Sequence, residues 1–188
     1  MTNLVCLLEE PSAKEMLLGI FPRLLSENIS VHYIVFEGKQ DLERRLVKRI
    51  RFWQKPNSFF LIMRDKDSGD CKEIKRGLVE KIVEADRQAE SMVRIACHEL
   101  ESFYLGDLEA VEKGLSISNL QQHQDKRIYR SPDSMPNAID LLKRATRSKY
   151  QKIAGSRAIG PYMSLNGSNR SRSFNVLISG VNRLLHDN

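Results

Sequence analysis

Four acidic residues are the side chains in this sequence best suited to chemistry. Glu9 and Glu10 follow one short apolar run, and Asp65 and Asp67 follow another. If the two runs are neighbouring strands of a parallel sheet, all four carboxylates meet at its carboxyl edge, where ligands of such sheets bind. Carboxylates gathered this closely repel unless one is protonated or a cation lies between them. Oxygen ligands without nearby Cys or His suit Mg²⁺ or Mn²⁺.

The elements that must position these acids alternate regularly along the chain. Short runs rich in Val, Ile, Leu and Phe predict strands, and segments with helical spacing separate them. We expect strands at residues 4–8, 31–36, 59–63 and 93–96, with helices over 11–25, 41–53 and 70–89 between them. The second of these helices is strongly basic, and Asp70 can cap the third. Helix-length connections imply parallel strands joined by right-handed crossovers. The predicted fold class is α/β, a parallel sheet of about four strands flanked by helices.

The strand signal fades after residue 97. We expect helices near residues 99–105, 108–113, 137–146 and 174–185, and a mobile surface loop over 164–173, which is rich in Ser, Asn, Gly and Arg. The chain is therefore divided into an α/β domain, residues 1–106, and a mostly helical, basic C-terminal extension, residues 107–188, packed on it.

Composition places the chain among ordinary globular proteins. Apolar residues make up 41% of its 188 residues and charged residues 29%, which favours a packed core over disorder. No apolar run approaches the roughly 20 residues that span a bilayer, and the first residues do not resemble a signal peptide. We therefore expect a cytoplasmic protein that neither spans nor binds a membrane. Cys6, Cys71 and Cys97 have no CxxC spacing and are interpreted as reduced thiols and not zinc ligands.

Positive charge is concentrated towards the end of the sequence. From residue 134 onwards there are nine Lys or Arg and two acids, whereas the first 133 residues hold 21 basic and 22 acidic residues. A basic segment on a near-neutral body attracts polyanions through phosphate contacts. Lys152, Arg157, Arg170 and Arg172 are the candidate phosphate contacts, and the alternative is a solvated surface that aids solubility.

Several segments together resemble a known family. LLEEPSAKEML, LIMRDKD and HELESFYLGD are similar to a TOPRIM-like group of uncharacterised bacterial proteins. Tyr150-x-Lys152 and Arg170-Ser171-x-Ser173-Phe174 match the C-terminal part of that group, so the resemblance covers nearly the whole chain. TOPRIM is the catalytic α/β unit of type II topoisomerases, primases and overcoming-lysogenization-defect nucleases. Members of the smaller group are often encoded beside an ATPase, in apparent anti-phage or mobile-element settings.

The resemblance implies a role for each acid. Glu9 corresponds to the TOPRIM glutamate that serves as metal ligand or general acid/base, and Asp65 and Asp67 correspond to the pair that binds Mg²⁺. Glu101 corresponds to an acid after the fourth strand that completes a second metal position. Glu10 departs from the broad pattern, in which glycine commonly follows the glutamate. The alternatives are an acid favoured by a helix N-terminus for Glu9 or Glu10, and turn residues for the two aspartates.

Three functions are consistent with these residues. The favoured one is a magnesium-dependent nuclease, or other phosphodiesterase acting on DNA or RNA, in a defence or mobile-element system. The second is a non-catalytic partner of an ATPase; the sequence contains no GxxxxGK[ST] phosphate loop, so a separate ATPase subunit would hydrolyse ATP. The third, a phosphoacceptor receiver domain, needs a fifth strand ending in lysine, and the sequence predicts none.

Overall fold

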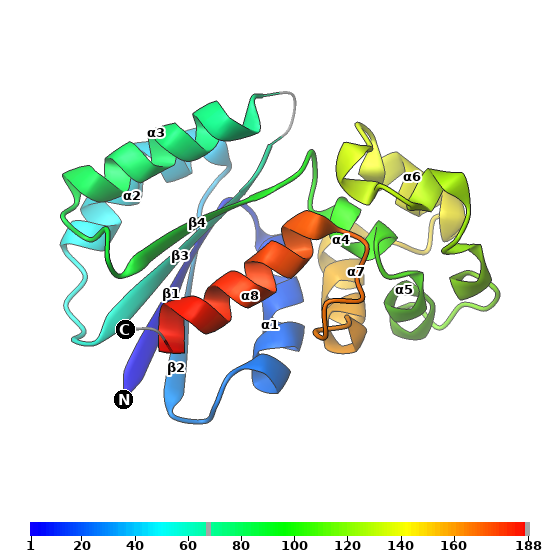
Figure 1. Cartoon of the computed structure of the whole chain (residues 1–188), viewed down its shortest axis with the longest axis horizontal. Coiled ribbons are helices and arrows are strands. Elements are labelled where there is room, and N and C mark those ends of the chain that lie inside the picture. Colours follow the sequence, from blue (N-terminus) through cyan, green and yellow to red (C-terminus); the bar gives the residue numbers. More distant parts are fainter. Residues whose placement is uncertain (67–68, 187–188) are drawn as a thin grey trace.

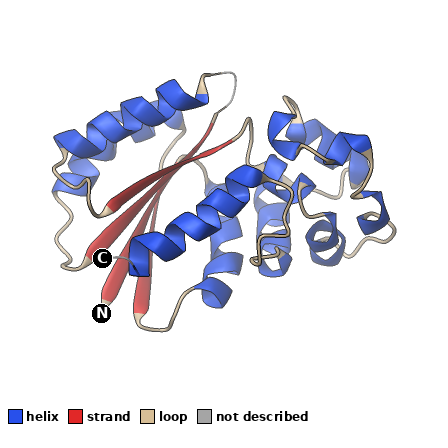
Figure 2. Ribbon diagram, viewed as in Figure 1, coloured by secondary structure: helices blue, strands red, loops and turns tan. Residues whose placement is uncertain are grey.

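A four-stranded parallel sheet forms the centre of the molecule. The computed structural model describes residues 1–66 and 69–186, so Asp67 lies outside the described residues. The strands are β1 (Thr2–Leu8), β2 (Ile29–Val35), β3 (Ser58–Asp65) and β4 (Ser91–Ala96), and their order in the sheet is β2-β1-β3-β4. Figure 2 shows them side by side with helices on both faces. The predicted α/β class with four parallel strands is confirmed.

The register of the strands brings their carboxyl ends together. Leu8 at the end of β1 lies opposite Val35 of β2 and Met63 of β3. At the next level, Asp65 of β3 lies opposite Ala96 of β4. The residues that follow β1, β3 and β4 therefore share one edge of the sheet, as the sequence predicts for neighbouring first and third strands.

Three helices of the N-terminal half connect the strands: α1 (Pro11–Leu24), α2 (Lys39–Arg51) and α3 (Cys71–Glu84). Helices α2 and α3 cover one face of the sheet, and α1 covers the other (Figure 1). Asp70 caps α3, because its carboxylate accepts hydrogen bonds from the backbone N–H groups of Lys72 and Glu73 at 2.8 and 2.9 Å. The predicted cap is confirmed.

The C-terminal half is helical. It contains α4 (Glu101–Leu105), α5 (Leu108–Gly114), α6 (Ala138–Ala145), α7 (Lys152–Ile159) and α8 (Arg172–His186), with short 3₁₀ turns at Gln121–His123, Arg127–Tyr129, Pro132–Ser134 and Gly160–Tyr162. The sequence did not predict α7, which contains Gly155 and Ser156, because neither residue favours a helix interior. Tertiary packing against α1 stabilises it.

The two halves share one hydrophobic core. Phe174 and Leu177 of α8 are fully buried and belong to the same cluster as Leu4 of β1 and Leu17 of α1. Helix α8 packs on β3 and β4, on the same face of the sheet as α1 (Figure 1). The extension thus completes the second face of the sheet.

The expectation of a surface loop over residues 164–173 is wrong for its last part. Asn169 and Ser171 are buried, and the amide of Asn169 donates to the carbonyl oxygen of Phe103 at 3.0 Å. The N–H of Arg170 donates to the carbonyl oxygen of Gly106 at 2.9 Å. These polar residues are buried because their hydrogen bonds are satisfied within the protein, which composition alone does not reveal.

None of the helices in the described part of the chain combines the length and apolar character that crossing a membrane requires.

A pair of glycines tests how closely α1 approaches the chain after α7. A Cβ added to Gly19 would lie 2.5 Å from the backbone nitrogen of Pro161, whereas one added to Gly77 of α3 meets no atom within 4 Å. We expect Gly19→Ala to lower the free energy of unfolding by about 1–3 kcal/mol, because the added methyl group overpacks this contact. Gly77→Ala should raise it by about 0.5–1 kcal/mol through helix propensity. Urea denaturation of the two variants measures both changes, and equal effects would contradict the close approach.

Candidate functional site

Glu9 and Glu10 occupy different surroundings although they are adjacent. The Glu9 carboxylate accepts a hydrogen bond from the backbone N–H of Asp65 at 3.0 Å, and the Nε of Arg64 lies 3.9 Å away. Arg64 is buried and also pairs with Glu43 of α2. Glu9 therefore ties the end of β3 to the start of α1 on the side of the sheet that α2 covers.

Glu10 lies with the helices on the other side. Its carboxylate is 2.5 Å from the Nζ of Lys152, the first residue of α7, and it accepts a hydrogen bond from the hydroxyl of the buried Ser12 at 2.5 Å. Glu10, the residue before Pro11, has extended backbone with φ −143° and ψ 158°, and adjacent side chains of an extended segment point to opposite sides. Glu10 thus contacts the C-terminal extension through Lys152.

Asp65 is buried at the carboxyl end of β3. Its side chain accepts a hydrogen bond from the backbone N–H of Leu100 at 3.2 Å. Burial raises the pKa of its carboxyl group well above the ordinary value, and the negative charges of Glu10, Glu101 and, more weakly, Glu9 raise it further. Asp65 is therefore the residue whose pKa is raised by all three neighbouring glutamates.

Glu101 lies at the first position of α4 and is 1% exposed. One of its carboxylate oxygens, Oε1, accepts a hydrogen bond from the hydroxyl of Tyr150 at 2.8 Å, whereas the buried Oε2 has no hydrogen-bond partner among the described residues. Burial raises the pKa of Glu101, and the hydrogen bond from Tyr150 opposes that shift. A buried carboxylate oxygen without a partner is costly, and a bound cation or a proton relieves that cost.

Lys152 supplies the positive charge of the site. Burial alone would lower its pKa, but the hydrogen bond and charge of Glu10, with the charges of Glu101 and Asp65, raise it overall. The ammonium group therefore stays charged at neutral pH. We call Glu10, Asp65 and Glu101 the acidic cluster; Lys152 and Tyr150 are its partners from the C-terminal half.

The acidic cluster has donor atoms that suit a hard divalent cation. All of them are carboxylate oxygens, which Mg²⁺ and Mn²⁺ prefer, and one of them has no hydrogen-bond partner in the described part of the chain. Within residues 1–66 and 69–186, however, no three acidic, His or Cys side chains stand in an arrangement ready to hold a metal ion. Asp67, predicted as a ligand, is outside those residues. The carboxylate oxygens are ligands that suit Mg²⁺, but the side chains of the acidic cluster would have to move closer together to bind it.

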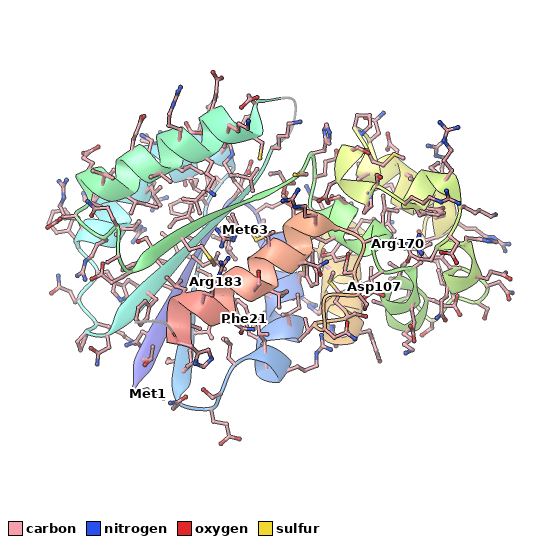
Figure 3. The ribbon with its side chains drawn as sticks, viewed as in Figure 1. Met1, Phe21, Met63, Asp107, Arg170 and Arg183 are labelled. Atoms are coloured by element: carbon pink, nitrogen blue, oxygen red, sulfur yellow. The ribbon has the colours of Figure 1, made fainter. Side chains whose placement is uncertain are left out.

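Most of the basic residues predicted to contact phosphate are paired with acids, although Arg170 and Arg172 line one pocket. Arg157 pairs with Glu15 of α1 at 2.7 Å, and Arg170 pairs with Asp125 and donates to a backbone carbonyl. Arg172 is exposed at the start of α8. Figure 3 shows Arg170 among the C-terminal helices near Asp107, apart from Met63 of β3. With Lys152 bound to Glu10, three of the four predicted contacts already have an acidic partner.

Two members of the site have contacts that the sequence does not predict. Glu10 is expected at this edge but not in a pair with Lys152, and Tyr150 enters the sequence analysis only through the Tyr150-x-Lys152 resemblance. Tyr150 is fully buried, and its hydroxyl orients Glu101. The only signals available were the Glu-Glu pair and the Tyr150-x-Lys152 spacing, and neither shows that α7 folds back against the sheet edge.

Fold and site together define an α/β protein whose parallel sheet carries a buried acidic cluster at its carboxyl edge. The chain belongs to the DUF4276 family, described as a domain of unknown function, which matches residues 8–182. That range includes every residue of the acidic cluster and both of its partners. No curated protein and no solved structure matches the chain.

Replacing Asp65 with Asn tests the repulsion within the cluster. Because its pKa is raised in the folded state, the folded protein binds more protons than the unfolded chain above about pH 3.9, so stability falls as pH rises towards the folded pKa. Asn keeps the hydrogen bond to Leu100 and removes the charge. We expect Asp65→Asn to raise the melting temperature in EDTA at pH 7–8 by about 2–4 °C for each kcal/mol relieved.

The gain should shrink as the pH approaches 4, where Asp65 of the wild type is also protonated. Glu27→Gln, which removes an exposed carboxylate between α1 and β2, is the control and should not change the melting temperature in a pH-dependent way. A lower melting temperature for Asp65→Asn at every pH would contradict the repulsion.

Proposed function

We propose that the protein is a magnesium-dependent phosphodiesterase that acts on nucleic acid, in a defence or mobile-element system. The observation that carries the proposal is the buried Oε2 of Glu101. It has no hydrogen-bond partner within residues 1–66 and 69–186, and it lies beside two further carboxylates at the carboxyl edge of a parallel sheet. The resemblance to TOPRIM-like proteins supports the same chemistry. Protein-held Mg²⁺ stabilises negative charge on a transferring phosphoryl group.

Each residue of the cluster has a defined part in this proposal. Asp65, Glu10 and Glu101 would hold the cation; Asp67, predicted as a further ligand, lies outside the described residues. Tyr150 fixes Glu101 through its hydroxyl, and Leu100 fixes Asp65 through its N–H. Glu9 accepts a hydrogen bond from the backbone N–H of Asp65 and so positions the Asp65 carboxylate. Asp65, whose pKa is raised, can also keep a proton at a pH where an exposed aspartate cannot.

Lys152 has two parts in the proposed function. With no cation present, its ammonium group offsets the charge of Glu10 at 2.5 Å. A cation drawn to the carboxylates would weaken that pair, and the freed ammonium group would lie next to a phosphate held at the same edge. We therefore propose that Lys152 contacts phosphate only after a cation has weakened its pair with Glu10.

A non-catalytic subunit of an ATPase is the second candidate. It is favoured by the Lys152–Glu10 pair, which compensates part of the cluster's charge without any metal, and by the lack of a preformed metal-binding group among the described residues. In that case the cluster would connect the two halves of the chain and do no chemistry.

Cleavage assays separate the two candidates. Purified protein is incubated with plasmid, linear duplex and single-stranded substrates, with Mg²⁺, with Mn²⁺ and with EDTA. We expect cleavage with a divalent cation and none in EDTA. We also expect Asp65→Asn and Glu101→Gln to lower the rate by at least about 100-fold, while circular dichroism remains that of the wild type. Cleavage by either variant at the wild-type rate would eliminate the acidic cluster as the site.

A tyrosine pair tests the positioning of Glu101. Tyr150→Phe removes the hydroxyl that binds Glu101 and should weaken activity by roughly 10–100-fold, with a higher Mg²⁺ concentration needed for half-maximal rate. Tyr162→Phe changes an exposed tyrosine in the turn after α7 and should leave both quantities unchanged. If Tyr150→Phe lowers the rate without changing the Mg²⁺ dependence, Tyr150 does not act through the cation site.

A further inference from the structure

Helix α2 carries a second concentration of charge, separate from the acidic cluster. Residues 39–55 include seven Lys or Arg and two acids, a local net charge of 7 − 2 = +5. The first 133 residues as a whole have 21 basic and 22 acidic residues, so their total conceals this excess. Arg45, Lys48, Arg49 and Phe52 are three or four residues apart and share one flank of the helix.

This flank borders a pocket of about 350 Å³ beside the edge strand β2. The pocket is lined by Ile34, Arg45, Lys48, Arg49, Phe52 and Trp53. Arg45 is bound to Asp41 at 3.0 Å. Lys48 and Arg49 are exposed, and neither side chain makes a hydrogen bond or ion pair with any residue that the structure describes. Their charge is therefore available to a ligand.

The aromatic residues of the pocket differ in their freedom. Trp53 is fixed, because its indole N–H donates to the hydroxyl of Ser58 at 2.9 Å and its ring lies 5.4 Å from His32. Phe52 is 62% exposed and takes no part in either hydrophobic cluster. An exposed phenyl ring alone is unremarkable, but here it stands beside two uncompensated cations. The combination suits a ligand that has both negative charge and flat rings.

We propose that this flank of α2 binds a single strand of nucleic acid, with phosphates on Lys48 and Arg49 and a base stacked on Phe52. Unpaired bases stack on exposed aromatic side chains next to a basic groove, whereas a duplex keeps its bases stacked inside. This inference extends the proposed function and rests on it, because nucleic acid as the class of ligand comes from that proposal.

The position of α2 connects this surface with the acidic cluster. The helix has 13 residues, a length of about 20 Å. Near its start, Glu43 pairs with Arg64, which lies 3.9 Å from Glu9 at the carboxyl edge of the sheet. The pocket lies at its other end. A nucleic-acid strand laid along the helix would thus lead from the pocket to Glu9, at the same carboxyl edge of the sheet that carries the acidic cluster on its other side.

Binding is measured in EDTA, so that cleavage plays no part. The probe is a fluorescein-labelled oligothymidylate of about 12 nucleotides, within the site sizes of known single-strand binders. Its affinity is followed by fluorescence anisotropy from low to high salt. The variants are Lys48→Gln with Arg49→Gln, Phe52→Ala and Phe52→Trp. Lys126→Gln with Arg127→Gln is the control, because it removes the same two residue types from an exposed segment at the far end of the molecule (Figure 1).

We expect the Lys48/Arg49 variant to bind at least tenfold more weakly at low salt. The slope of log affinity against log salt should fall by about 1.4, since each phosphate contact on a single strand contributes roughly 0.7. Phe52→Ala should lose about tenfold in affinity with the slope unchanged, and Phe52→Trp should bind like the wild type. The control variant should stay within twofold of the wild type.

Several results would overturn the proposal. They are no binding by the wild type at low salt, equal losses in the Lys48/Arg49 variant and the control, or affinity that ignores Phe52. Equal affinity for polyglutamate would show a general polyanion surface and would overturn it as well. Asp65→Asn should bind the probe normally. An oligonucleotide bound at α2 but never cut would refute the proposed cleavage while leaving this surface in place.

Discussion

Burial of like charges at the carboxyl edge of the sheet is the constraint on which the rest of the site depends. Asp65 and Glu101 are both nearly inaccessible to water, and both have raised pKa values because burial disfavours the charged carboxylate. The protein tolerates them through hydrogen bonds from Leu100 and Tyr150 and through the ammonium group of Lys152. Apolar residues at these positions would avoid the cost of burying charge, and the proposed function accounts for the carboxylates that are found there instead.

The C-terminal half is needed for both the core and the site. Helix α8 covers the sheet with residues such as Phe174, so deleting everything after residue 134 would remove part of the core as well as positive charge. Helix α7 brings Lys152 to Glu10, and Tyr150 just before it reaches Glu101. Substitutions are therefore sharper probes of the basic residues than truncation, because they leave the shared core in place.

Charge along the sequence and charge on the surface lead to different expectations about nucleic acid. The last third of the chain holds the excess of basic residues, but Lys152, Arg157 and Arg170 are bound to carboxylates in the fold. Lys48 and Arg49 of α2 have no acidic partner among the residues that the structure describes, and they lie in the first 133 residues, whose overall charge is near zero. Ion pairing decides which charges can act on a ligand, and that is a property of the folded chain.

By itself, the sequence determined the alternation of strands and helices, because hydrophobic periodicity and turn residues are local signals. It also placed Glu9, Glu10 and Asp65 at one edge, since parallel strands end together. Tertiary structure alone decided that Glu9 and Glu10 lie in different surroundings and that Glu101 meets Tyr150, a residue 49 positions later. Such pairings depend on how α7 packs against α1, and no local pattern encodes contacts across that distance.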